Sequence, residues 1–525
     1  MANILFVAAE NDALPNGKVG GIADVVRDVP QFLATQQQGV DVITPSYGFH
    51  STQPYAEHVG SVSVSFRGKP EQLDLYRLAI STSNEHVQQW VLEHPYFAAN
   101  GAGTIYYDDG PNRPFASDAN KFALFCIGVA ELVTHHWFER IDILHLHDWH
   151  AALVPVLAHF APQYHPLIQK QIVYTIHNLA LQGIRPLHGD ESSLGAWFPE
   201  LPLEQDTVID PRYRNCINPT RAAINLANKV HAVSPTYATE IVKPSDAAAG
   251  FIGGEGLELD LQKAEAEGRL VGILNGTQYQ ETVKWGDYVT AALSALKKWH
   301  KSATASSAEE VAHQLATDRL LQWKQQSTSM ESNKPPNETL VTSIGRLTSQ
   351  KVALLVTEVD GEIAINKLLD VLANYNSKLV ILGSGDKTLA QTMSATMAEK
   401  ENFLFLNGYD TALSDAIYSA GDLFLMPSSF EPCGISQLLA LQAGQPCFVH
   451  GVGGLNDTIV DNKTGFIFYG NSPQEQVRNM LTRFEEALAF KRHSPEQWLN
   501  MVESAKSARF EWPEVIKEYR EKLYG

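Results

Sequence analysis

Short apolar runs alternate with helical segments along both halves of the chain, and this alternation constrains the fold more than any other feature. Apolar runs of this length, bounded by turn residues, are typical of strands buried on both faces of a parallel sheet. The runs are NILFVAA, VDVITP, DILHLH, QIVYTIHN and KVHAVS in the N-terminal half, and LVTSIGRL, KLVILGSG, NFLFLNGY, DLFLMPS, PCFVHG and GFIFYG in the C-terminal half. We therefore predict an α/β fold class, with two doubly wound domains that face a cleft.

The length of the chain predicts how many domains it forms, and its charge limits the classes of molecule that it can bind. Its 525 residues are too many for one hydrophobic core, which again predicts two large domains. The net charge of −19, without a long basic run, argues against general nucleic-acid binding, because that binding needs clustered lysine and arginine. The chain contains no stretch of about twenty apolar residues, so no membrane span is predicted. Any phosphate site in this acidic chain must therefore be local.

The first residues and the four cysteines indicate a cytoplasmic protein. The opening MANILFVAAEND has no basic leader, so it predicts a buried first strand and not a signal peptide. The cysteines form no CxxC pattern, so a disulfide framework is not expected and a reducing cytosol fits.

Two polar stretches and the C-terminal tail are not expected to belong to the hydrophobic cores of the two domains. Residues 301–310 and 327–338 are rich in Ser, Thr, Asn and Pro, which predicts a surface insertion or loop over about 301–338. The tail is predicted to be helical and amphipathic, and its Trp512 and Tyr524 need a surface on which to pack.

A glycine loop, NGKVGGIADVVRDVP, follows the first predicted strand. Gly20 and Gly21 open a predicted helix, where backbone N–H groups can approach an anion closely. Lys18 adds a full positive charge. A tight strand-to-helix turn explains the two glycines equally well, so both interpretations stay open at this point.

A pair of cations, Arg346 and Lys351, lies in SIGRLTSQK, at the end of one predicted strand and the start of the next helix. Two cations in that position can clamp a diphosphate without a metal. Solvated surface charges are the commoner fate of Arg and Lys. We favour the binding interpretation because an acidic chain has placed both cations at a strand's carboxyl end.

An acid, Glu431, stands in SSFEPCGISQLLALQAG where another strand gives way to a helix. Its oxygens can accept hydrogen bonds from sugar hydroxyls or stabilise developing positive charge. The structural alternative is an acid that complements the helix dipole. We expect Cys433 to be a small buried residue and not a nucleophile. Gly453 and Gly454 form a further glycine turn after the strand PCFV.

Histidine-rich stretches, HLHDWH and YTIHN, end two predicted strands and contain His145, His147, Asp148, Trp149, His177 and Asn178. His145 and His147 share one strand face, so zinc has to be considered. A sugar subsite formed by an aromatic face and a carboxylate is equally reasonable. Metal is the weaker interpretation, because no cysteine or second carboxylate completes a ligand set. The chain also lacks an Asp-x-Asp at an apolar strand end and a P-loop motif.

In combination, these motifs resemble those of bacterial glycogen synthases and plant starch synthases. The matching runs are KVGGIADVV, HLHDWHAALVP, YTIHNLALQG, ANKVHAVSPTYATEI, GILNG, GRLTSQK, LGSGD and PSSFEPCGISQL through GGLNDT, in the family's order. The resemblance implies a GT-B fold with two Rossmann-like domains. It places an acceptor-side domain over 1–270, a nucleotide-sugar domain over 271–500, and a helical tail over 501–525 that returns to the first domain.

The resemblance also implies a function and a set of site residues. The function is retaining transfer of glucose from ADP-glucose to the non-reducing end of an α-1,4-glucan, without a metal or other cofactor. The implied partners are a nucleotide sugar and a glucan or other saccharide, with no nucleic acid and no membrane. The implied catalytic residues are His177, Arg346, Lys351 and Glu431. The implied donor-binding residues are Lys18, Gly20, Gly21, Asn275, Tyr409, Cys433, Gly434, Gly453 and Gly454, and the implied acceptor-binding residues are Asp148, Trp149 and Asn178.

Departures from the family's usual residues keep two alternatives open. Val19, Leu181, Val352 and Val452 are among the positions beside these motifs where the family usually has another residue. One alternative is a diverged glucosyltransferase with another nucleotide donor or a small acceptor. The other is an inactive glucan-binding protein, which is disfavoured because the cations, Glu431 and His177 are all present.

Overall fold

The computed structural model describes residues 2–35, 38–80, 84–138, 140–201, 206–279, 287–300, 307–328 and 338–525. The chain divides into two compact units. Unit 1 contains Met1–Ser245, Gly253–Gly276 and Glu511–Gly525, and unit 2 contains Asp246–Ile252 and Thr277–Phe510. The sequence-based boundaries stood at 270 and 500, whereas the chain, apart from the short segment Asp246–Ile252, leaves unit 1 after Gly276 and returns at Glu511.

Unit 1 is built on one sheet with the strand order β11-β10-β7-β6-β1-β2-β5-β4-β3. Its strands are β1 (Ile4–Val7), β2 (Val40–Pro45), β3 (Ala56–Phe66), β4 (Lys69–Leu78), β5 (Val87–Glu93), β6 (Ile143–His147), β7 (Gln171–Ile176), β10 (Lys229–Ala232) and β11 (Leu270–Gly272), and a small separate sheet pairs β8 (Arg185–Pro186) with β9 (Cys216–Ile217).

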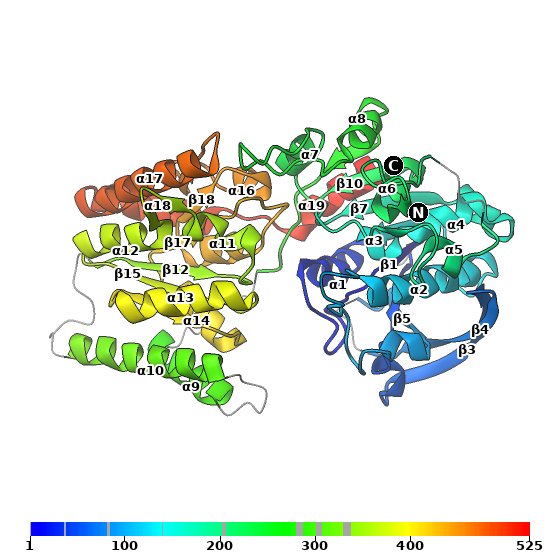
Figure 1. Cartoon of the computed structure of the whole chain (residues 1–525), viewed down its shortest axis with the longest axis horizontal. Coiled ribbons are helices and arrows are strands. Elements are labelled where there is room, and N and C mark those ends of the chain that lie inside the picture. The colour runs from blue at the N-terminus through cyan, green and yellow to red at the C-terminus, as the bar shows by residue number, and fades with distance from the viewer. Residues whose placement is uncertain are drawn as a thin grey trace. The chain divides into compact units, whose positions relative to one another are not determined.

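Helices cover this sheet, as Figure 1 shows. They are α1 (Gly21–Leu33), α2 (Ala116–Thr134), α3 (Asp148–Ala151), α4 (Leu153–Phe160), α5 (Leu194–Trp197), α6 (Pro219–Leu226), α7 (Pro235–Ile241), α8 (Glu258–Ala266) and α19 (Trp512–Glu518), with short 3-10 helices at His50–Thr52, Pro95–Ala98 and Pro162–Gln169.

Five parallel strands of unit 1, β1, β2, β6, β7 and β10, match the predicted apolar runs, whereas β11 and the edge formed by β5, β4 and β3 were not predicted. The pairs β3–β4 and β4–β5 are antiparallel. Along β3, buried residues alternate with exposed ones near its end, so the strand has one solvated face and no continuous apolar run. The predicted strands β1, β2, β6, β7 and β10 differ from β3 in pattern because nearly all of their residues are buried.

Unit 2 has a fully parallel sheet with the order β16-β15-β12-β17-β18-β19. Its strands are β12 (Leu340–Ile344), β15 (Lys378–Leu382), β16 (Phe403–Leu406), β17 (Leu423–Met426), β18 (Cys447–His450) and β19 (Gly465–Phe468), with a small hairpin of β13 (Glu358–Val359) and β14 (Glu362–Ile363).

The helices of unit 2 lie on both faces of this sheet (Figure 1). They are α9 (Tyr288–His300), α10 (Ser307–Thr328), α11 (Ser349–Val356), α12 (Ala364–Asn374), α13 (Lys387–Glu399), α14 (Thr411–Ala420), α15 (Ser436–Ala443), α16 (Gly453–Thr458), α17 (Pro473–His493) and α18 (Pro495–Ser507). The polar stretch expected to be an insertion is in part helical, because α10 begins at Ser307; residues 301–306 and 329–337 lie outside the described residues.

The C-terminal tail returns to unit 1, as expected, and packs against α1 (Figure 1). Its Trp512 is 1% exposed and donates a hydrogen bond from Nε1 to Asp28 Oδ2 at 2.8 Å. After α19 the chain continues in a π-helical turn, Tyr519–Leu523, and Tyr524 Oη lies 2.7 Å from His145 Nδ1. These apolar and polar contacts explain why Trp512 and Tyr524 needed a packing surface.

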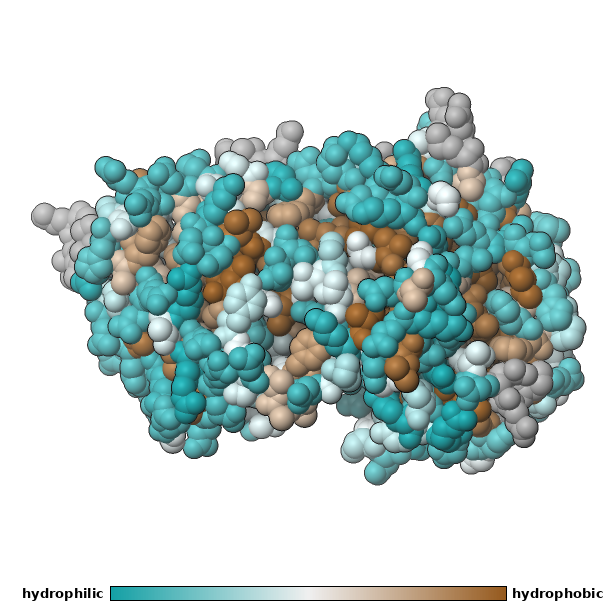
Figure 2. Space-filling view, turned by 90° about the horizontal axis from the view of Figure 1, so that it is seen from above, coloured by the Kyte–Doolittle hydropathy of each residue, from teal (hydrophilic) through white to brown (hydrophobic). Residues whose placement is uncertain are grey.

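Hydrophilic residues cover most of the face drawn in Figure 2, and hydrophobic residues are visible in patches between them. Such a surface suits the net charge of −19. Among the described residues, no helix combines the length and the apolar character needed to cross a membrane.

Candidate active site

In unit 2, the strand order reverses between β12 and β17. From β12 the chain winds outward to β15 and β16, and it then returns to the other side of β12 with β17. Ligands of doubly wound sheets bind at the carboxyl ends of the strands on either side of such a point. Arg346 follows β12, and Glu431 lies in the loop after β17. The predicted cations and the predicted acid therefore flank this position.

Lys351 and Glu431 form an ion pair. Lys351 stands in the first turn of α11, and its side chain is 22% exposed, against 6% for Glu431. Ser428 Oγ donates a further hydrogen bond to Glu431 Oε2 at 3.1 Å. The carboxylate is thus held from two sides, which fixes where its oxygens point.

Backbone contacts attach the start of α11 to the loop after β17. Gln350 Nε2 donates to the carbonyl of Phe430 at 3.1 Å, and the Ser429 amide donates to the carbonyl of Gln350 at 2.8 Å. Arg346, by contrast, is exposed, and no ion pair or hydrogen bond of its side chain is found in the described part of the chain. One predicted cation is therefore part of the local structure, and the other is free for a ligand.

The predicted glycines of unit 2 pack closely against the turn that carries Glu431. The Gly454 amide donates to the Glu431 carbonyl at 3.0 Å, and a Cβ at Gly454 would lie 2.2 Å from the carbonyl oxygen of Cys433. Gly434 has φ +80°, a conformation that side chains disfavour. Gly453 stands beside them at the start of α16, and Cys433 is buried. These glycines let two backbone turns approach each other.

Two further predicted donor-binding residues lie elsewhere. Tyr409 follows β16 in unit 2 and is 63% exposed. Asn275 belongs to unit 1 and is buried, and its Oδ1 has no hydrogen-bond partner in the described part of the chain. Neither residue is part of the cluster around Glu431 in unit 2.

In unit 1, the glycine loop already holds an anion, the carboxylate of Glu10. The amides of Val19 and Gly20 donate to Glu10 Oε2 at 2.7 and 2.5 Å, and Tyr106 Oη donates to Oε1 at 2.7 Å. Gly21 begins α1 directly after these amides. We did not single out Glu10 from the sequence, although its place just after the first strand was a usable signal.

Lys18 lies beside this loop and faces two carboxylates. Its Nζ lies 2.5 Å from Asp24 Oδ1 and 3.5 Å from Asp12 Oδ2, and its side chain is 43% exposed. The cation is therefore accessible and neutralised within unit 1. A substrate phosphate would have to compete with Asp24 for it.

The histidines at the carboxyl ends of β6 and β7 are hydrogen-bonded and largely buried. His147 Nδ1 lies 2.9 Å from His177 Nε2, and burial lowers the pKa of both imidazoles well below 6.5. His177 is therefore neutral at physiological pH. His145 bonds Thr175 Oγ1 and Tyr524 Oη, so both of its ring nitrogens are used.

Asp148 has the left-handed backbone conformation, with φ +52°, directly after β6. Its Oδ1 accepts a 2.7 Å hydrogen bond from the His177 amide, and burial raises the pKa of the carboxyl to about 7. Asn178 uses its own Oδ1 to accept from the Ala180 amide at 3.0 Å. The structure thus joins three predicted residues at the carboxyl ends of β6 and β7.

Trp149 differs from the expectation of an open aromatic face. It is 5% exposed and packs against Phe122 and His150, and a Cβ at Gly183 would lie 2.4 Å from its ring. Because the ring is covered, Trp149 does not offer an open face on which a sugar could stack. The burial arises because Trp149 lies on α3, under neighbouring aromatic residues.

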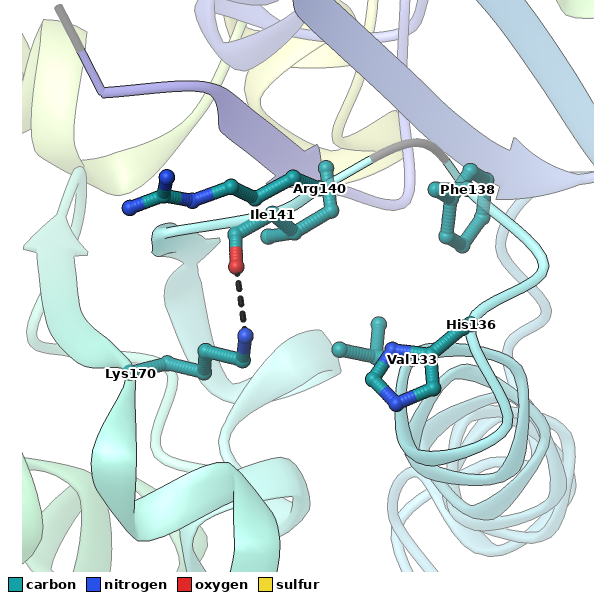
Figure 3. Close-up of a pocket in the computed structure, with 6 residues that line it drawn as sticks. All are labelled: Val133, His136, Phe138, Arg140, Ile141 and Lys170. Atoms are coloured by element: carbon teal, nitrogen blue, oxygen red, sulfur yellow. Dashed lines mark hydrogen bonds between the residues drawn. The ribbon is translucent and has the colours of Figure 1, made fainter.

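A pocket of about 320 Å³ lies at the opposite edge of the unit 1 sheet, before the first residues of β6 and β7. Figure 3 shows its lining residues, Val133, His136, Phe138, Arg140, Ile141 and Lys170. Lys170 Nζ donates to the Ile141 carbonyl at 2.7 Å, and Arg140 forms an ion pair with Asp142 at 2.7 Å. This pocket is separate from the predicted site, which lies at the carboxyl ends of the strands.

No metal-binding group of three or more His, Cys, Asp or Glu side chains occurs among the described residues. His145 and His147, the pair considered for zinc, are instead engaged with Tyr524, Thr175 and His177.

Comparisons with known proteins decide the family. Residues 3–263 match the family model of the starch synthase catalytic domain, and residues 324–497 match that of glycosyl transferases group 1. A glycogen synthase from Streptococcus agalactiae is 30% identical over 541 residues, which cover 99% of each chain. The chain belongs to the glycogen synthase family. A relative from Koribacter versatilis is 31% identical and covers 98% of this chain and 96% of its own.

Solved structures confirm the GT-B fold of this glycogen synthase family member. The catalytic domain of starch synthase IV from Arabidopsis thaliana, bound to ADP and acarbose, has a TM-score of 0.72 at 25% identity, and the match covers 99% of this chain and 98% of that one. A sucrose-phosphate synthase from Thermosynechococcus elongatus shares the fold alone, with a TM-score of 0.53 at 17% identity. The predicted family, fold and enzyme class, a hexosyltransferase, are confirmed, whereas the roles of single site residues stay predictions.

Proposed function

We propose that this glycogen synthase family member transfers glucose from ADP-glucose to the non-reducing end of an α-1,4-glucan, with retention at the anomeric carbon. The observation that carries the proposal is its full-length similarity to glycogen synthases, together with the cations and the acid at the switch point of unit 2. The similar starch synthase IV binds ADP and acarbose, which favours ADP-glucose over other donors and a glucan as acceptor.

On the donor side, the exposed Arg346 and the ammonium of Lys351 stabilise the diphosphate as it leaves. The C1–O bond to the phosphate breaks, and its electron pair goes to the phosphate oxygen. Fixed cations lower the barrier because the negative charge on that oxygen is larger in the transition state than in the bound donor. Lys351 is oriented for this role by Glu431.

Glu431 has a second role toward the donor glucose. Because Lys351 and Ser428 hold one oxygen of its carboxylate, the group is oriented before substrate binds. An oriented carboxylate can accept hydrogen bonds from glucose hydroxyls and favours the positive charge that develops at C1. Tyr409 supplies an exposed ring for the adenine.

The new bond forms between C1 and the 4-hydroxyl of the terminal glucose of the acceptor. The proton of that hydroxyl passes to the departing phosphate, so no strong general base is needed. This fits the chemistry of unit 1: His177 is neutral, its Nε2 is engaged with His147, and Asp148 is held by a backbone amide. These groups position a sugar and do not need to ionise it.

Cofactor and compartment belong to the same proposal. The proposed reaction uses side-chain cations at the phosphate and needs no metal, so chelation with EDTA should leave the rate unchanged. All four cysteines carry free thiols, which suits a reducing cytoplasm. The glucan acceptor and the nucleotide sugar are the partners that we assign.

A donor panel tests the proposal. Purified protein is incubated with ADP-, UDP- and GDP-glucose, each with glycogen, with maltose as a small acceptor and without acceptor, and released diphosphate and product length are measured. We expect rapid transfer only with ADP-glucose and glycogen. Transfer only to a small acceptor, or from another nucleotide, would overturn the proposed substrates. Nucleotide-sugar binding without any ADP release over long incubation would favour an inactive glucan-binding protein.

A further inference from the structure

The loop of residues 407–410, which we call the base loop, joins β16 to α14 and carries Tyr409. The Tyr409 side chain is 63% exposed, so the place of its ring depends on the backbone that carries it. A base that stacks on the ring gains most when the loop is held in its binding conformation beforehand, because less order is then lost on binding. What holds this loop therefore bears on donor affinity.

Three contacts attach the base loop to the helices α9 and α10. Lys298 on α9 pairs with Asp410, Nζ to Oδ2, at 2.9 Å. His313 on α10 bonds the carbonyl of Asn407 through Nε2 at 2.8 Å. The Trp299 ring lies against Gly408, since a Cβ there would be 2.6 Å from it. The loop is thus contacted at both ends and in the middle.

The two helices are themselves anchored to the same part of unit 2. Arg319 Nη2 donates to the Met397 carbonyl and Trp323 Nε1 donates to the Glu401 carbonyl, each at 2.9 Å. The rings of Trp299 and His313 lie 5.6 Å apart, which links α9 to α10 at the loop. Helix α10 therefore follows the chain from the end of α13 through β16 to the base loop.

We propose that α9 and α10 are a positioning element for the base loop, and that Lys298, Trp299 and His313 are the positioning residues that set affinity and preference for the donor base. The inference rests on the proposed function, because it takes Tyr409 as the residue that stacks on adenine. It goes beyond that function by assigning a role to two helices that contain none of the predicted site residues. His313 is 5% exposed and Trp299 is half-buried, and both contact the backbone of the base loop.

The test compares Lys298→Met with Lys298→Arg and with the matched control Lys297→Met. Lys298 is 66% exposed, so its replacement leaves the fold intact, and exposed Lys297 has no ion pair in the described part of α9 or elsewhere in the described residues. An exposed ion pair contributes little to stability, so we expect the KM for ADP-glucose to rise by only about threefold in Lys298→Met. The kcat at saturating donor should stay unchanged, and Lys298→Arg should restore the KM.

Base preference and ADP binding complete the test. The ratio of kcat/KM for ADP-glucose over UDP-glucose should fall in Lys298→Met and in Trp299→Leu, and calorimetry should show weaker ADP binding without any need for turnover. A loss of kcat at unchanged KM, or an equal KM rise in Lys297→Met, would overturn the positioning role. If the unaltered protein transfers glucose from no donor, the proposed function fails instead, and that result is seen before any variant is made.

Discussion

Lys351 and Glu431 form a largely buried ion pair at the carboxyl ends of the unit 2 strands, with the side chains 22% and 6% exposed. Arg346, five residues before Lys351, is exposed and has no partner in the described part of the chain. The two predicted phosphate-binding cations therefore differ in kind: one also supports the local structure, and the other does not. This difference gives their variants different signatures.

Replacing Lys351 by Met should lower both activity and stability. The variant leaves the buried carboxylate of Glu431 without its cation, which costs about 2–4 kcal/mol of unfolding free energy. The loss of a preorganised charge at the phosphate should lower kcat about a hundredfold or more. The double variant Lys351→Met/Glu431→Gln should recover stability but not activity, as chemical denaturation and initial rates will show. Additive stability losses in the two single variants would contradict the coupling.

Replacing Arg346 by Ala should lower activity alone. Because the guanidinium is exposed and has no partner among the described residues, the midpoint of thermal unfolding should stay within about 2 °C of that of the unaltered protein. The kcat should fall about a hundredfold or more, since an electrostatic contact in the transition state is lost. Lys463→Ala, at an exposed cation in the turn after α16, serves as the control and should keep full activity. Full turnover by Arg346→Ala would remove the phosphate role.

Asp148→Asn should change how stability depends on pH. Burial raises the pKa of Asp148 to about 7, so the folded state holds its proton more tightly than the unfolded state. The contribution of this carboxyl to the free energy of unfolding is therefore fully present at about pH 4 and is lost as the pH rises to about 7. The neutral His147 and His177 act in the opposite sense, losing stability as the pH falls below about 6.5.

The difference between variant and unaltered protein isolates Asp148 from those histidines. Asn tolerates the left-handed conformation that this position has, with φ +52°. The gain in unfolding free energy caused by Asp148→Asn should therefore be larger at about pH 8 than at about pH 5, by about 2–4 kcal/mol. Urea unfolding at both pH values measures it, and a difference independent of pH would refute the raised pKa.

Tyr409→Ala should weaken donor binding without affecting the fold. The ring is 63% exposed, and stacking of a base on an aromatic ring is worth about 1–3 kcal/mol. We expect the KM for ADP-glucose to rise about tenfold or more, with the melting temperature unchanged and with Tyr409→Phe close to the unaltered enzyme. Steady-state kinetics of the three proteins decide this, and an unchanged KM in Tyr409→Ala would show that the base binds elsewhere.

Trp512→Ala should destabilise unit 1. Trp512 is 1% exposed, packs on the apolar face of α1 and donates to Asp28 Oδ2 at 2.8 Å. Loss of a buried Trp costs about 3–5 kcal/mol. In Trp512→Phe most of the packing stays and mainly the hydrogen bond is lost, so about 1–2 kcal/mol is expected. Calorimetry should show a lowered transition for unit 1, and hydrogen exchange should place the loss in α1 and α19.

Several parts of the structure followed from the sequence alone. Most of the parallel strands of both units were predicted, because strands buried on both faces consist of short apolar runs, whereas β5 and β11 were not predicted. The positions of Arg346, Lys351 and Glu431 followed as well, since residues directly after a strand of a parallel sheet gather at one edge. These are local signals, and each can be found within a few residues of its strand.

Only the tertiary structure decided the features that depend on which segments pack together, whether these are near or far apart in the chain. The glycine loop holds the carboxylate of Glu10, Trp149 is covered by its aromatic neighbours, and the antiparallel edge β3–β5 has one solvated face. The helices α9 and α10 contact the base loop about a hundred residues later in the chain, as the pair Lys298–Asp410 shows. Spacing along a sequence determines which face a side chain shares with its near neighbours, but partners of this kind are chosen by packing, hydrogen-bond geometry and charge once the sheets have formed.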